Sequence, residues 1–82
     1  MTMNEQRRAP RRTISSAGTI ELDSGEHIPC MVRNLSDTGA GLEVSSRLSL
    51  PLEFHLSIEL DHSRRYCAVV WCRETLVGVV FV

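Results

Sequence analysis

Hydrophobic and polar residues alternate along most of this chain, and the longest alternation runs through residues 48–60. Every even position in it is apolar, from Leu48 to Leu60, and every odd position is polar or proline. A period of two places one set of side chains in a core and the other in solvent, so the pattern predicts a β-strand. Pro51 has no backbone N–H to donate, and regular pairing is therefore expected to begin after it.

Shorter stretches of the same kind predict five more strands, at residues 19–23, 28–32, 40–44, 66–72 and 76–82. The fourth of these is apolar on both faces, which predicts a central, well-covered strand. Turn signals separate the strands, at residues 23–25, 34–39, 61–63 and 73–75. No helical periodicity of useful length appears. Short strands separated by frequent turns predict an all-β fold, a six-stranded antiparallel barrel.

The charge is distributed unevenly over what is expected to be a single small domain of 82 residues. Residues 1–12 carry four Arg and one Glu, a charge of +3, and residues 13–82 carry five Arg and nine acids, a charge of −4, which together give the net charge of −1. An acidic body is poorly suited to long nucleic acid, whose binding needs a basic face. A basic segment on such a body suits a small anion better.

Other residue types point away from catalysis and from metal binding. The three cysteines form no CxxC pair, and Cys30 is in phase with Ile28 and Val32, so it is expected in the core. The histidines are scattered over turns and polar faces, and no nucleophile–base set is present. Residues 1–10 are polar, and no stretch approaches the roughly 20 apolar residues of a membrane span. We therefore expect a cytoplasmic protein that is not an enzyme, has reduced thiols and no cofactor, and does not contact a membrane.

Two short motifs carry the candidate chemistry. The first is the arginine segment, which contains Arg7, Arg8, Arg11 and Arg12. The second is the turn Asn34-Leu35-Ser36-Asp37-Thr38-Gly39. If the first hairpin turns at Ser24–Gly25, Asn34 lies opposite about Ser15, and the arginine segment lies at the same barrel mouth as the second motif. Guanidinium groups beside a small polar turn can hold a phosphorylated, planar ligand such as a nucleotide.

These residues resemble the signature of the PilZ domain, a bacterial receptor module for cyclic di-GMP. Its pattern is RxxxR, often RRxxxR, followed some 20–30 residues later by (D/N)xSxxG. The arginine segment and Asn34–Gly39 match the two parts, and the final stretches Val69–Trp71 and Gly78–Phe81 are also similar to the family. The resemblance covers about residues 5–82.

The resemblance implies a fold, a ligand and a set of contacts. It implies a Greek-key split β-barrel at residues 14–82, preceded by a flexible arginine-rich arm at residues 1–13. The arm would wrap over cyclic di-GMP and become ordered, and the signal would pass to a protein partner. The implied ligand contacts are Arg7, Arg8, Arg11, Arg12, Asn34, Ser36 and Gly39. Within them, the RRxxxR form favours Arg8 and Arg12. The helix that follows the last strand in many members is expected to be absent, and the protein to be a monomer or a homodimer.

Other interpretations of the same residues stay open at this point. The arginine segment can be a tail kept for solubility, and Asn34–Gly39 can be an ordinary turn. A PilZ-like module that binds proteins but no nucleotide is the main alternative. A single-stranded nucleic-acid binder would need exposed aromatic residues for stacking, and only Phe54, Tyr66, Trp71 and Phe81 are available.

Overall fold

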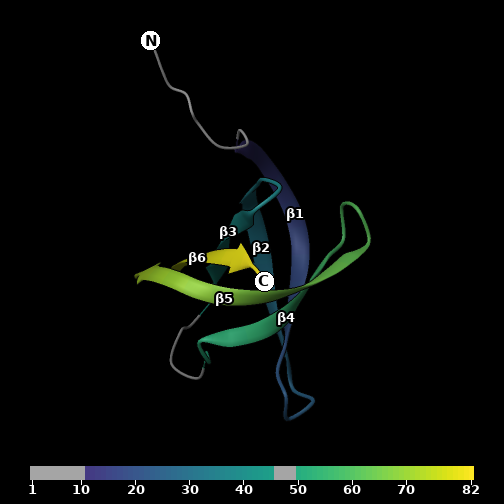
Figure 1. The fold of residues 1–82 in the computed structure, drawn as a ribbon, viewed down its shortest axis with the longest axis vertical. Coiled ribbons are helices and arrows are strands. Elements are labelled where there is room, and N and C mark those ends of the chain that lie inside the picture. The colour runs from purple at the N-terminus through teal and green to yellow at the C-terminus, as the bar shows by residue number, and fades with distance from the viewer. Residues whose placement is uncertain (1–10, 46–49) are drawn as a thin grey trace.

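The computed structural model describes residues 11–45 and 50–82, and these residues form six β-strands. The strands are β1 (Arg12–Glu21), β2 (His27–Leu35), β3 (Gly39–Val44), β4 (Glu53–Ile58), β5 (Ser63–Arg73) and β6 (Leu76–Phe81). No helix occurs in the described residues (Figure 1). The all-β prediction and the number of strands are confirmed.

The strands form one antiparallel sheet that closes in the order β1-β2-β3-β6-β5-β4. The first three are hairpin neighbours, and β4 returns to pair with the other edge of β1. This is the Greek-key arrangement, in which the fourth strand lies beside the first. The β1–β4 ladder is short, but it pairs Gly18–Glu21 with His55–Ile58, so the barrel is closed rather than split.

The β1–β2 hairpin differs by a small shift from the predicted register. Asn34 lies opposite Thr13 rather than Ser15, and the register changes between Thr13 and Ser16 through a β-bulge. Strand β1 already begins at Arg12, so the last two residues of the expected arm belong to the sheet. The shift leaves Arg11 and Arg12 beside the second motif, because the register differs from the predicted one by only two residues.

The barrel interior is filled by the inward-facing side chains of every strand. The largest completely buried ones include Phe54, Ile20, Leu42 and Leu56. Burying such a side chain on folding stabilises the folded state by about 1.5–3 kcal/mol. Cys30 is half-buried and packs against this core, as its phase predicts.

The long alternation at residues 48–60 corresponds to a shorter strand than predicted. Strand β4 covers only Glu53–Ile58, and Leu52 and Leu60 are 75% and 57% exposed. A turn follows at residues 59–62, where His62 has a φ of 55°, so the chain leaves the sheet before Leu60 can reach the core. Leu48 lies outside the described residues.

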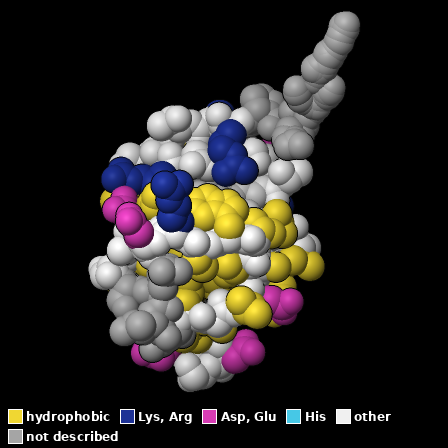
Figure 2. All heavy atoms as spheres, turned by 90° about the vertical axis from the view of Figure 1, so that its left-hand side faces the viewer, with side chains coloured by type: hydrophobic (Ala, Val, Ile, Leu, Met, Phe, Trp, Pro, Cys, Tyr) yellow, Lys and Arg dark blue, Asp and Glu magenta, His cyan; other side chains and the backbone are white. Residues whose placement is uncertain are grey.

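The prediction that residues 66–72 are well covered is wrong. In β5 only Cys67 is fully buried, while Val70 and Trp71 are 56% and 46% exposed. A bulge between Val69 and Trp71 disturbs the alternation, and Trp71 lies over Gly78 on the outer face of the barrel. Figure 2 shows hydrophobic side chains across the middle of one face, with dark-blue basic side chains above them.

Candidate functional site

One end of the barrel brings Arg11 and Arg12, the described part of the arginine segment, to the second motif. The start of β1, the β2–β3 turn, the β4–β5 turn and the end of β6 all lie at this end (Figure 1). Arg12 pairs with Leu35, and the Phe81 N–H donates to the Thr38 carbonyl at 2.8 Å. Between these segments is a hollow of about 400 Å³. Its lining residues are Arg12, Leu35, Ser36, Asp37, Ile58, Asp61, Ser63 and Arg65.

Arg11 and Asn34 form a contact on the outer side of the barrel end. The Arg11 Nη1 donates a hydrogen bond of 2.8 Å to Asn34 Oδ1. The Asn34 amide lies over Gly41 of β3, where a Cβ atom would be 2.6 Å from Asn34 Nδ2. The missing side chain at Gly41 therefore leaves the space in which Asn34 meets Arg11.

Ser36 organises the turn that follows Asn34. Its backbone N–H donates to the Gly39 carbonyl at 2.9 Å, which closes the turn. The Ser36 hydroxyl accepts a hydrogen bond of 3.3 Å from the Thr38 N–H. Gly39 sits against the Val79 carbonyl of β6, and a Cβ atom there would clash with that backbone. Gly39 thus allows the close approach of two strands that a side chain would block.

Arg12 and Arg65 provide the positive charges inside the hollow. They come from β1 and β5, and the guanidinium carbon of Arg65 lies 4.2 Å from the centroid of the Phe81 ring. Asp37 and Asp61 line the same hollow with negative charge. The Ser63 hydroxyl donates to Asp61 Oδ1 at 2.6 Å, and this bond lowers the pKa of the Asp61 carboxyl. The described lining therefore has two cationic and two anionic side chains.

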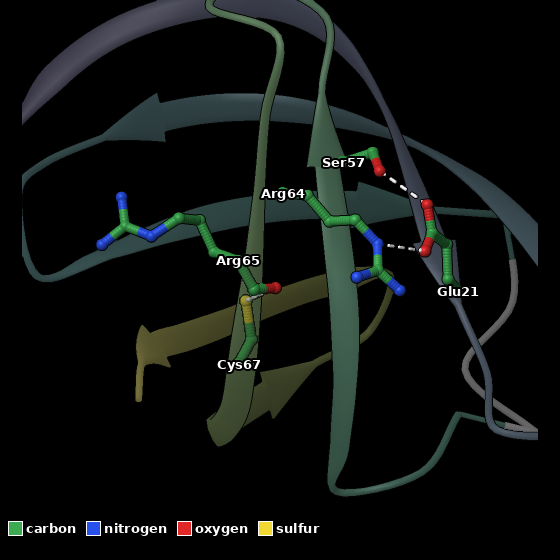
Figure 3. Close-up of polar contacts among 5 residues, drawn as sticks. All are labelled: Glu21, Ser57, Arg64, Arg65 and Cys67. Atoms are coloured by element: carbon green, nitrogen blue, oxygen red, sulfur yellow. Dashed lines mark hydrogen bonds and ion pairs between the residues drawn. The ribbon is translucent and has the colours of Figure 1, made fainter.

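A separate polar cluster on the barrel wall fixes the strand that carries Arg65. Glu21 accepts hydrogen bonds from the Ser57 hydroxyl at 2.6 Å and from Arg64 Nε at 2.7 Å (Figure 3). These two bonds, the Ser57 bond first, lower the pKa of Glu21. The cluster links β1, β4 and β5 on the face opposite to that of Arg65.

The residues predicted from the sequence occupy three kinds of position. Arg12 and Ser36 line the hollow, and Arg11 and Asn34 meet beside it. Gly39 packs against the backbone of β6. Arg7 and Arg8 lie outside the described residues.

Four polar residues of the hollow were missed by the motif analysis, namely Asp37, Asp61, Ser63 and Arg65. Asp37 stands inside the second motif. Asp61 and Ser63 belong to the predicted turn at residues 61–63, and Arg65 follows it. A signal for Arg65 exists, because it has the same strand phase as the buried Cys67.

The described residues contain neither a metal-binding cluster nor a membrane-spanning helix. No cluster of three or more His, Cys, Asp or Glu side chains there is arranged to hold a metal ion. Within the same residues, no helix has the length and hydrophobicity needed to cross a membrane.

Comparison with known proteins identifies the family. Curated protein sequences gave no match to this chain. The family model described as PilZ domain matches residues 5–82, which is nearly the whole chain and contains both motifs. PilZ domains are ligand-binding and adaptor modules that bind cyclic di-GMP and interact with partner proteins. The chain therefore belongs to the PilZ domain family.

Proposed function

We propose that this protein is a cyclic di-GMP receptor that relays the second-messenger signal to a protein partner. The observation that carries the proposal is the meeting of the two motifs at one barrel end. Arg12 and Ser36 line the same hollow, and Arg11 bonds to Asn34 beside it. An ordinary turn, or a tail kept only for solubility, would not require these residues to meet at one barrel end.

The chemistry of the site matches the ligand. Cyclic di-GMP carries two phosphates and two guanines, and a guanidinium group can bind either a phosphate or the O6/N7 edge of guanine in bidentate fashion. A volume of about 400 Å³ is within the range of small-molecule sites. Ser36 and Asn34 offer short polar groups for the ligand's remaining donors and acceptors.

Charge balance supports a role for the arginine segment. The hollow itself is neutral, because Arg12 and Arg65 are matched by Asp37 and Asp61. Two phosphates need additional positive charge, which Arg11 and the sequence neighbours Arg7 and Arg8 can supply. In our proposal the segment closes over the bound ligand, becomes ordered, and so presents a new surface to the partner.

The alternative, a module that binds proteins without nucleotide, is favoured by one observation. Val70 and Trp71 expose apolar surface on the outer face of β5. Such surface suits protein contacts whether or not a ligand is bound. The two functions differ in whether the isolated protein binds cyclic di-GMP.

Isothermal titration calorimetry of the 82-residue chain with cyclic di-GMP tests the proposal. We expect binding near micromolar, which corresponds to about −8 kcal/mol. Arg8→Ala and Arg12→Ala should each weaken binding by about tenfold or more, since a charge-assisted hydrogen bond contributes about 1.5–3 kcal/mol. Arg73→Ala, at the far end of β5, is the matched control and should bind normally.

Two results would contradict this proposal. If saturating cyclic di-GMP produces no heat and shifts no amide resonance of the arginine segment, the receptor function is refuted and the protein-binding module is supported. Normal affinity in both arginine variants would refute the assigned contacts.

A further inference from the structure

Arg65 belongs to neither sequence motif, yet it lines the hollow together with Arg12 and Ser36. Side chains on a strand alternate between its two faces. Arg65 has the phase of Cys67, which is completely buried, and its partner on β4 is the buried Leu56. It therefore lies on the core-facing side of β5, at the rim of the barrel, where its side chain is exposed to solvent.

The neighbouring Arg64 points the other way. Figure 3 shows the two guanidinium groups on opposite sides of β5, with Arg64 directed toward Glu21. Arg64 is thus occupied by an ion pair with Nε–Oε1 at 2.7 Å. Within the described part of the chain, no ion pair or hydrogen bond engages the Arg65 guanidinium.

Arg65 is nonetheless held in place, because its guanidinium carbon lies 4.2 Å from the centroid of the Phe81 ring. Phe81 is half-buried, packs against the core, and is fixed by its backbone bond to Thr38. A guanidinium group stacked on an aromatic ring keeps its N–H groups in the plane, where they can engage an anion. The stacking also reduces the side-chain freedom that binding would otherwise remove.

We infer that Arg65 is an additional phosphate-binding residue of this site, and that Phe81 positions it. The inference rests on the proposed function, because it takes the phosphate to be one of those of cyclic di-GMP. Arg65 then binds from β5, and Arg12, which lines the same hollow, binds from β1. Both chemical requirements of a phosphate, charge and a bidentate donor pair, are met by this one side chain.

Calorimetry with cyclic di-GMP tests this with two adjacent variants. Arg65→Gln should weaken binding by about tenfold or more, whereas Arg64→Gln should leave it within about twofold. Both variants remove one positive charge from the same strand, so a general charge effect would lower both affinities alike. Arg65→Lys keeps the charge but loses the planar pair of N–H donors, and we expect a several-fold loss of affinity.

Phe81 is tested through its conservative replacement. Phe81→Leu should weaken binding by several-fold, and Phe81→Tyr, which keeps the ring, should restore it. Equal affinities for these two variants would refute the positioning role. Thermal unfolding of each variant shows whether the barrel is intact.

The failures of the two proposals can be told apart. If the wild-type protein binds and Arg65→Gln binds equally well, the inference about Arg65 is wrong and the receptor function stands. If the wild-type protein does not bind cyclic di-GMP at all, both are wrong.

Discussion

Gly41→Ala should disturb the candidate site without disturbing the barrel. A Cβ atom at Gly41 would lie 2.6 Å from Nδ2 and 2.9 Å from Oδ1 of Asn34, closer than such atoms approach in proteins. Both atoms are at the end of a side chain that can rotate. The Asn34 amide therefore turns away, and the 2.8 Å hydrogen bond from Arg11 is lost.

Gly41→Ala should change the stability of the barrel very little, because two effects oppose each other. Replacing Gly by Ala in a strand stabilises the fold by about 0.5–1 kcal/mol. Loss of the exposed Arg11–Asn34 bond costs a similar amount, about 0.5–1.5 kcal/mol, so the two effects nearly cancel. In an Asn34→Ala background there is no amide to displace, and Gly41→Ala should then be stabilising by up to about 1 kcal/mol.

The affinity for cyclic di-GMP responds differently in our proposal. Displacing Asn34 removes one positioned polar contact and the partner that orients Arg11, so Gly41→Ala should weaken binding by roughly tenfold. The assay is a double-mutant cycle of Gly41→Ala and Asn34→Ala, measured by urea denaturation and by calorimetry. Additive changes in stability would refute the steric argument. Unchanged affinity in Gly41→Ala would refute the role given to Asn34.

Three further predictions concern the barrel itself. Ser16→Ala should lower the free energy of unfolding in urea by about 1–2 kcal/mol, because the buried Ser16 hydroxyl accepts a backbone N–H of the β4–β5 turn at 3.1 Å; no change would contradict this. Only Cys72 should react quickly with a thiol reagent at pH 8, because burial raises the pKa of the Cys30 and Cys67 thiols to about 11; rapid labelling of a second thiol in the folded protein would be the opposite result. The folded state lowers the pKa of Glu21 below 4.5. The ionised Glu21 carboxylate therefore stabilises the fold above that pH, and this stabilisation is lost on acidification. Glu21→Gln should therefore lose less stability than the wild type as the pH falls from 5 to 3 in urea titrations.

The fold was predictable because local signals agreed with the tertiary structure. The alternation at residues 48–60 contains β4, which ends at Ile58, and turn residues separate most strands from the next. The meeting of Asn34 with the arginine segment followed from the hairpin alone, since any register near the observed one brings them to the same barrel end. The sequence therefore predicted which end of the barrel carries the candidate site.

The lengths of the strands and their exposure were not predictable in the same way. The alternation continues through Leu60, but β4 pairs only as far as Ile58, and the turn is fixed by a tertiary contact between Leu60 N–H and Ser16. Likewise, the apolar run around Trp71 does not show that its strand has a bulge and an uncovered outer face. These features depend on neighbours that are distant in the sequence.

Strand alternation also changes how the arginine motif should be interpreted. Arg11 and Arg12 are neighbours, yet one bonds Asn34 outside the barrel end and the other lines the hollow. Each of the two possible RxxxR pairs ends in one of them, so the final residues of the two pairs have different positions. Arg64 and Arg65 divide in the same manner, with only the second facing the hollow. Only two of these four arginines line the hollow, so a count of adjacent arginines gives twice the positive charge that lines it. In our proposal, the further charge that the two phosphates need comes from the arginines that precede Arg11 in the sequence.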